Sequence, residues 1–136
     1  MQPLSPILVA EDDDDDFHFL RRAVREAKLG NPILRFRDGL ELTKFLESAS
    51  YFKDSHDVPW LLLLDLSMPI MSGFEVLQWL HTHPRRAQVR PVIVSGFYHP
   101  ADVEHSRSLG ATEYVVKPIK ADTIAILTRR AVPVAA

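Results

Sequence analysis

Residues 60–65 read Trp60-Leu61-Leu62-Leu63-Leu64-Asp65, an unbroken apolar run that ends on an acid. A run this short without polar alternation is typical of a strand buried on both faces, and it cannot span a bilayer. Similar runs alternate along the chain with segments whose apolar residues recur at helical spacing. They lie at 7–10, 33–37, 91–94 and 112–116. This alternation predicts an α/β fold, with a doubly wound, five-stranded parallel sheet covered by helices on both faces.

The spacing of apolar residues predicts a helix after each strand. These helices fall at 17–27, 42–49, 74–80, 100–110 and around 124–127. Gly30 is predicted to stop the first helix, and Gly110 to cap the fourth. The pair Asp38-Gly39 is predicted to form a turn after the second strand, and residues 50–59 a polar loop.

The chain has 136 residues, with 16 basic and 18 acidic side chains and a formal net charge of −2. This length predicts one domain, residues 1–136, with no fused output module. The lack of cysteine excludes disulfides and thiol nucleophiles, and the N-terminus lacks the pattern of a signal peptide. We therefore expect a cytoplasmic domain that does not bind a membrane. The near-neutral charge also argues against direct binding of nucleic acid.

A third of the acidic side chains fall in one run, residues 11–16. In a doubly wound sheet, ligands bind outside the carboxyl ends of the strands, so the residues that follow each strand matter most. Those residues are Glu11 and Asp12 after the first strand, Asp65 after the third, Ser95 after the fourth and Lys117 after the fifth. Taken singly, each has an ordinary explanation as a helix cap, a turn residue or a surface ion pair. Together on one edge, they indicate a site.

The chemistry of this set favours a cation and a phosphoryl group. Carboxylates held close together repel each other unless a cation intervenes, and oxygen ligands suit Mg²⁺. An aspartate can attack phosphorus, and phosphoryl transfer needs mainly positioning and charge neutralisation, to which Lys117 and Ser95 can contribute. Asp13 adds one more acid beside the site. Residues 14–16 are instead predicted to begin a helix as a solvated patch.

Five pieces of the sequence occur in a specific order and spacing. They are Ile7-Leu8-Val9-Ala10-Glu11-Asp12-Asp13, residues 63–69 with Gly73, Pro91-Val92-Ile93-Val94-Ser95-Gly96, residues 109–111, and Tyr114-Val115-Val116-Lys117-Pro118. Over about residues 6–131, this set resembles the receiver domains of two-component response regulators. The resemblance implies a flavodoxin-like receiver fold with strand order 2-1-3-4-5. It also implies a phosphorelay response regulator that accepts a phosphoryl group from a histidine kinase.

The resemblance assigns roles to positions of this chain. Asp65 matches the phospho-acceptor, and the reaction requires Mg²⁺ or Mn²⁺. The implied metal ligands are Asp12 directly, Glu11 mostly through water, Asp65 itself and the backbone carbonyl of Ser67. Lys117 matches the phosphate-contacting lysine, and its bond to Pro118 matches one that is usually cis in the family.

The resemblance also implies a switch. Ser95 matches a hydroxyl that contacts the phosphoryl group, and Tyr114 an aromatic residue that turns inward when that hydroxyl moves. The signal then reaches the surface formed by the strand at 91–94, the helix from Pro100, the strand at 112–116 and the last helix. Ser67 and Phe97 occupy positions that influence access of water and phosphodonor. We expect Phe97 to shield the acyl phosphate.

The implied partners are a sensor histidine kinase and an unidentified downstream protein, with homodimerisation as a further route. Asn31-Pro32, residues 37–39 and the long segment before Trp60 resemble the small regulators of bacteriophytochromes, which suggests such a photoreceptor as the kinase. A domain of this kind catalyses its own phosphorylation and is not a stand-alone enzyme. Two alternatives are a degenerate receiver that serves as a protein-interaction scaffold, and a small phosphohydrolase that forms an aspartyl-phosphate. The second would need an acid where the chain has Ser67.

Overall fold

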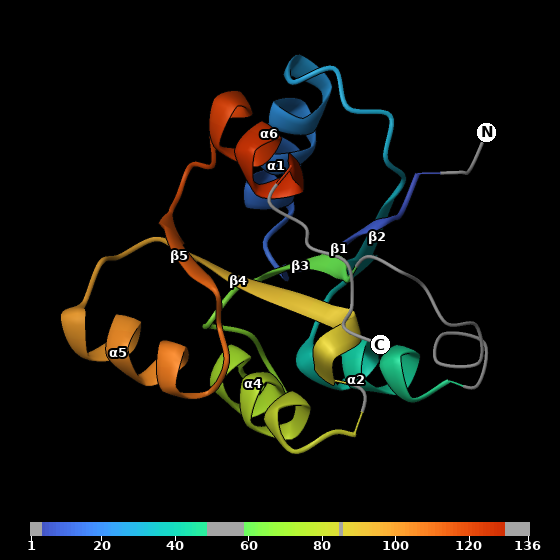
Figure 1. Ribbon diagram of the computed structural model, residues 1–136. Coiled ribbons are helices and arrows are strands. Elements are labelled where there is room, and N and C mark those ends of the chain that lie inside the picture. Colours follow the sequence, from blue (N-terminus) through green and yellow to red (C-terminus); the bar gives the residue numbers. More distant parts are fainter. Residues whose placement is uncertain (1–3, 49–58, 85, 130–136) are drawn as a thin grey trace.

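A computed structural model describes residues 4–48, 59–84 and 86–129. Within them, five parallel strands form one sheet in the order β2-β1-β3-β4-β5, which confirms the predicted fold class and strand order (Figure 1). The strands are β1 (Ile7–Ala10), β2 (Ile33–Phe36), β3 (Trp60–Leu64), β4 (Val89–Ser95) and β5 (Glu113–Val116). The helices are α1 (Asp14–Glu26), α2 (Gly39–Glu47), α4 (Gly73–His81), α5 (Pro100–Ser108) and α6 (Ala121–Arg129), with a 3₁₀ turn at Arg86–Gln88.

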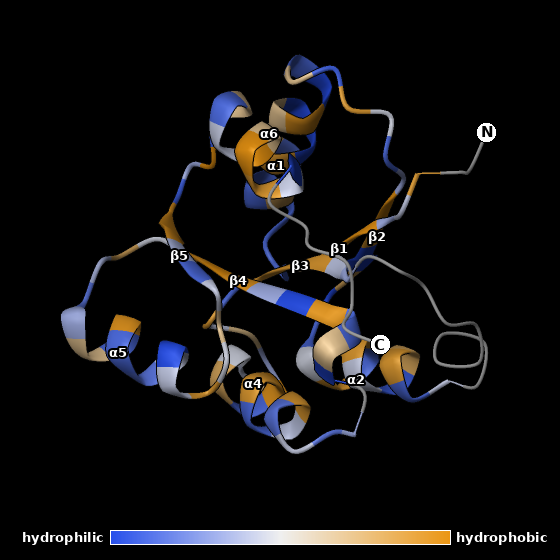
Figure 2. Cartoon of the chain, in the orientation of Figure 1, coloured by the Kyte–Doolittle hydropathy of each residue, from blue (hydrophilic) through white to orange (hydrophobic). Residues whose placement is uncertain are grey.

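The apolar run of β3 lies at the centre of two hydrophobic cores. Leu62 and Leu64 belong to the core between the sheet and helices α2 and α4. Leu61 and Leu63 point the other way, into the core shared with α1 and α6. Figure 1 shows these helices on opposite faces of the sheet, with α5 on the side of α2 and α4, and Figure 2 shows hydrophobic residues concentrated on the strands. An unbroken apolar run is required because successive side chains enter different cores.

Local hydrogen bonds explain where the helices begin. The Asp13 carboxylate caps α1 by accepting from the backbone N–H of Asp16 at 2.9 Å. Helix α4 begins with a capping box, in which Ser72 and Glu75 each bond the other's backbone N–H. The prediction that residues 14–16 begin a helix is thus confirmed. No helix among the described residues is long and apolar enough to cross a membrane.

Three predicted boundaries were wrong. Helix α1 ends at Glu26 rather than at Gly30, because the chain already leaves the helix at Lys28, which has a positive φ of 58°. The pair Asp38-Gly39 does not form a separate turn, because the Asp38 carboxylate accepts from Glu41 N–H and caps α2 directly.

The third boundary concerns β4, which begins at Val89, two residues before Pro91. A charged residue therefore lies inside the strand: Arg90 is buried, and its guanidinium donates to the backbone carbonyl of Leu127 in α6. The end of the helix predicted at 42–49 and almost all of the loop predicted at 50–59 lie outside the described residues.

Candidate phosphoryl-transfer and metal site

Backbone hydrogen bonds beyond the strand ends bring distant residues to one edge of the sheet. The N–H of Asp65 donates to Ala10 O at 3.1 Å, which continues the pairing of β3 with β1 by one residue. The N–H of Glu11 donates to Phe36 O at 3.0 Å, and that of Lys117 to Ser95 O at 2.7 Å. The predicted site residues are therefore held by the sheet itself, as expected for a doubly wound fold.

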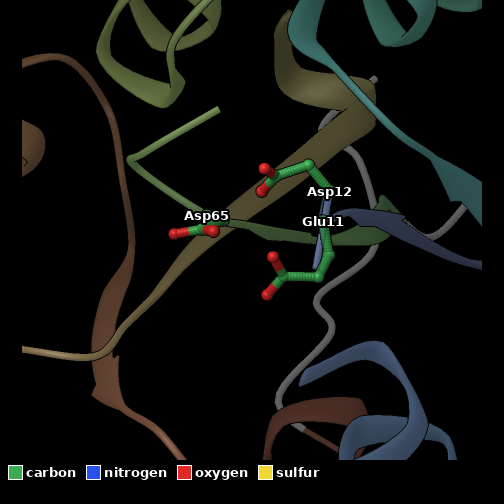
Figure 3. Close-up of side chains that lie close together, drawn as sticks. All are labelled: Glu11, Asp12 and Asp65. Atoms are coloured by element: carbon green, nitrogen blue, oxygen red, sulfur yellow. The ribbon is translucent and has the colours of Figure 1, made fainter. Parts of the chain in front are cut away.

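Three carboxylates meet at this edge. Glu11 and Asp12 follow β1, Asp65 follows β3, and one oxygen from each lies within 4.8 Å of the others (Figure 3). Glu11 and Asp65 are buried, with 4% and 8% of their surfaces exposed, whereas Asp12 is exposed. Three converging carboxylates form an all-oxygen donor set that fits a hard divalent cation such as Mg²⁺ or Mn²⁺.

Lys117 supplies a positive charge inside this group. Its Nζ lies 2.6 Å from Glu11 Oε1, 2.8 Å from Asp16 Oδ2 and 3.3 Å from Asp65 Oδ2. Burial alone would lower the pKa of the Lys117 ammonium, but hydrogen bonds to Asp16 and Glu11 and the charge of Asp65 outweigh it and raise that pKa. The lysine therefore stays charged. The Lys117-Pro118 peptide bond is cis.

The electrostatics of Glu11 are consistent with a cation site. Burial raises the pKa of Glu11 to about 7; the hydrogen bond from Lys117 opposes this effect, and the neighbouring Asp65 adds to it. A buried carboxylate with a second acid beside it is more easily ionised when a cation is close. The pKa is raised in spite of the Lys117 hydrogen bond, so the lysine does not fully compensate for the burial of Glu11 and the charge of Asp65.

Asp16 is the site residue that the sequence reasoning missed. It was assigned to a solvated patch that begins a helix, yet its carboxylate contacts the Lys117 amine. Its position contained a usable signal, because it lies one helical turn before Leu20, which begins the buried stripe of α1. The stripe that packs on the sheet therefore continues, at its N-terminal end, into the site.

The Asp13 carboxylate does not join those of Glu11 and Asp12, which precede it in the sequence. Its carboxylate caps α1, and its own N–H donates to Glu11 Oε2 at 3.2 Å. It is not part of the three-carboxylate group. The Asp13 side chain therefore fixes the start of the helix, and its backbone N–H holds the Glu11 carboxylate.

The remaining predicted residues surround the acidic group. The backbone N–H of Ser67 donates to Asp65 Oδ1 at 3.3 Å. Ser95 Oγ accepts from the N–H of Phe97 at 3.3 Å, and the hydroxyl of Tyr114 donates to the carbonyl of Phe97 at 2.7 Å. The hydroxyls of Ser95 and Tyr114 thus both contact the loop after β4. Phe97 is 71% exposed, and the centre of its ring lies 6.0 Å from that of His99.

A cavity of about 230 Å³ opens beside the acidic group. Its polar wall includes Glu11, Asp16, Asp65 and Lys117, and its apolar wall includes Val9, Leu63, Val94 and Ile119. The arrangement places a buried carboxylate, a fixed amine and a candidate cation site around one accessible space. These are the elements that a phosphoryl-transfer site uses.

Several known proteins are similar to this chain in sequence and in fold. The curated response regulator Rcp1 of Synechocystis sp. (strain ATCC 27184 / PCC 6803 / Kazusa) is 28% identical over 115 residues, which cover 85% of this chain and 78% of Rcp1. The structure of the bacteriophytochrome response regulator AtBRR has a TM-score of 0.77 and 30% identity, covering 93% of both chains. The phosphorylated cyanobacterial phytochrome response regulator RcpA has a TM-score of 0.72 and 25% identity, covering 92% of this chain and 89% of RcpA. The response regulator receiver domain matches residues 7–129, nearly the whole chain, and the protein therefore belongs to that family.

Proposed function

We propose that this receiver domain accepts a phosphoryl group from the phosphohistidine of a sensor histidine kinase onto Asp65. The observation that carries the proposal is the position of the Asp65 carboxylate. It is buried at the end of β3, within 4.8 Å of the oxygens of Glu11 and Asp12 and 3.3 Å from the amine of Lys117. A carboxylate placed beside fixed positive charge and a candidate cation site is a competent nucleophile toward phosphorus.

In the proposed reaction, a carboxylate oxygen of Asp65 attacks phosphorus, and the bond from phosphorus to the histidine nitrogen breaks. The nitrogen keeps the electron pair of that bond, and Asp65 becomes an acyl phosphate. The Lys117 amine neutralises charge on the phosphoryl oxygens, and the Ser95 hydroxyl donates to one of them. A Mg²⁺ or Mn²⁺ ion bound by Glu11, Asp12, Asp65 and the backbone carbonyl of Ser67 would supply further positive charge to the same oxygens.

The proposed signal runs through the loop after β4. If Ser95 turns toward the phosphoryl group, it releases the N–H of Phe97, whose carbonyl accepts from Tyr114. Tyr98 lies edge-on to Tyr114 with ring centroids 6.0 Å apart, so movement of either ring changes the surface. We propose that the surface of β4, α5, β5 and α6 carries the signal to a downstream protein or a second copy of the chain. The likeness to AtBRR makes a bacteriophytochrome the candidate kinase.

Phosphorylation of Asp65→Asn tests this function. The protein is incubated with Mg²⁺ and a small acyl phosphate donor, and the bound phosphate is quantified. We expect label on the wild type and none on the variant, because an amide is not a competent nucleophile. Asp15→Asn is the matched control, since Asp15 is an exposed acid in the first turn of α1.

The outcomes separate the three functions. A variant that is still labelled at normal stoichiometry would refute the assignment of Asp65. Rapid turnover of phosphoesters, measured as released phosphate, would instead favour a phosphohydrolase. A wild-type protein that accepts no label from any donor would favour the scaffold function.

A further inference from the structure

The Lys117 ammonium contacts three carboxylates, and only two of them belong to the group of converging carboxylates. Glu11 and Asp65 belong to the group of converging carboxylates that we assign to the cation and to phosphorylation. Asp16 does not belong to that group; it extends from the first turn of α1 and contacts the amine at 2.8 Å. The amine therefore has one partner outside the proposed cation site.

We infer that Asp16 is a positioning residue: it shares the Lys117 ammonium with Glu11 and Asp65 and so limits how far the lysine competes with a divalent cation for those two acids. The inference rests on the proposed function in so far as that function gives the cation its purpose. Without Asp16, the partners left to the amine would be the two acids that a cation also needs. A lysine drawn fully onto them would compete with the cation, because both neutralise the same charge.

The contact between Asp16 and Lys117 is fixed from both ends. The backbone N–H of Asp16 donates to the Asp13 carboxylate that caps α1, and the backbone N–H of Lys117 donates to Ser95 O. The backbone at each end of the contact is therefore set in advance, which favours a preorganised geometry. The Lys117 side chain is 17% exposed and the Asp16 side chain 37% exposed, so solvent only partly weakens their attraction.

A simpler explanation is that this ion pair merely ties α1 to the end of β5. The two explanations differ in whether Asp16 acts through Lys117 on the cation. A structural tie affects stability and leaves cation affinity unchanged. A positioning role affects cation affinity, and the effect disappears once the lysine is removed.

The test is a double-mutant cycle on the affinity for Mn²⁺. Mn²⁺ is titrated into the full chain, and the free ion is measured by its electron paramagnetic resonance signal. The four proteins are the wild type, Asp16→Asn, Lys117→Met and the double variant, with Asp15→Asn as control in both backgrounds. We expect Asp16→Asn to weaken Mn²⁺ binding about fivefold more than Asp15→Asn, which removes an equal charge from the same helical turn. In the Lys117→Met background, the two substitutions should have equal effects, because the amine is absent.

Three results would overturn the positioning role. One is equal weakening by Asp16→Asn and Asp15→Asn in the wild-type background. Another is an undiminished effect of Asp16→Asn when Lys117 is methionine. The third is a fall in stability toward urea with unchanged Mn²⁺ affinity, which is the signature of a structural tie.

Failure of the proposed function would look different. Phosphorylation of Asp65 is measured separately, with Mg²⁺ and a phosphodonor. If Asp65 accepts no phosphate while the Mn²⁺ cycle behaves as expected, the phosphorylation proposal fails and the role of Asp16 stands.

Discussion

Adding one methyl group at Gly73 is expected to disturb Asp65 more than it disturbs folding. A Cβ at Gly73 would lie 2.3 Å from the carbonyl oxygen of Asp65 and 2.7 Å from the Cα of Leu66. Both atoms belong to the backbone, which cannot rotate away as a long side chain can. The N–H of Gly73 also donates to Leu66 O at 2.9 Å, so helix α4 begins in direct contact with the segment that carries the phospho-acceptor.

The size of the effect follows from this geometry. Relieving the contact to an ordinary van der Waals separation of 3.4 Å requires the backbone at Asp65 to move by about 1 Å. Overpacking of this kind costs about 1–3 kcal/mol, and the higher helix propensity of alanine offsets up to about 1 kcal/mol. A domain of this size has about 5–15 kcal/mol of stability, so the variant should fold. A displacement of 1 Å at a reacting group can nevertheless lower the rate by about 100-fold.

Urea unfolding and the initial rate of phosphorylation by a small phosphodonor measure the two effects. The matched control is Gly96→Ala, because a Cβ at Gly96 would have no neighbour within 4 Å. We expect the control to retain both properties and Gly73→Ala to lose about 1–2 kcal/mol of stability and most of its phosphorylation rate. A Gly73→Ala protein with wild-type stability and rate would refute the reasoning.

Four further substitutions test other parts of the structure. Arg35→Met should lower the free energy of unfolding by about 1–3 kcal/mol, because the guanidinium donates to Glu11 O and lies 4.4 Å from the centre of the Phe17 ring. Arg37→Met, which removes an exposed ion pair, should leave urea unfolding nearly unchanged, and equal effects of the two would contradict this view. Ile70→Gly should raise stability by about 0.5–1 kcal/mol in thermal unfolding, since a β-branched residue with a φ of 68° is strained and Ile70 is 74% exposed. A lower melting temperature would argue against strain. Phe97→Glu should speed hydrolysis of the acyl phosphate if the ring shields it, and an unchanged lifetime would exclude shielding.

Burial on both faces made the sheet predictable from the sequence. A central strand of a covered parallel sheet has apolar residues facing both cores, so an unbroken apolar run such as 60–64 predicts a strand at the centre of the sheet. The end of the run then locates the residue at the edge of the sheet. For this reason Asp65 could be placed beside Glu11 from the sequence alone, and the structure brings them together as expected.

Contacts between distant segments were not predictable in the same way. From the sequence, the fourth strand was predicted to begin after Arg90. The backbone carbonyl that accepts a hydrogen bond from the Arg90 guanidinium belongs to α6, which is distant in the sequence. Asp13 and Asp16 are both acids in one run, and local composition does not distinguish the helix cap from the partner of Lys117. That distinction depends on the direction in which α1 leaves the sheet.

The net charge of −2 is a property of the whole chain and understates the negative charge around the site. The ion pairs near the carboxyl ends of the strands fall into two groups. In the first, Asp14 pairs with Arg35 and Arg37. In the second, Lys117 pairs with Glu11, Asp16 and Asp65, and Asp12 converges on Glu11 and Asp65. With every member ionised, the second group has four acids and one base, a surplus of three negative charges. Because both arginines pair in the first group, only Lys117 opposes the charge of the three converging carboxylates. A divalent cation bound there would offset most of that surplus, provided that Asp16 keeps its hold on the lysine.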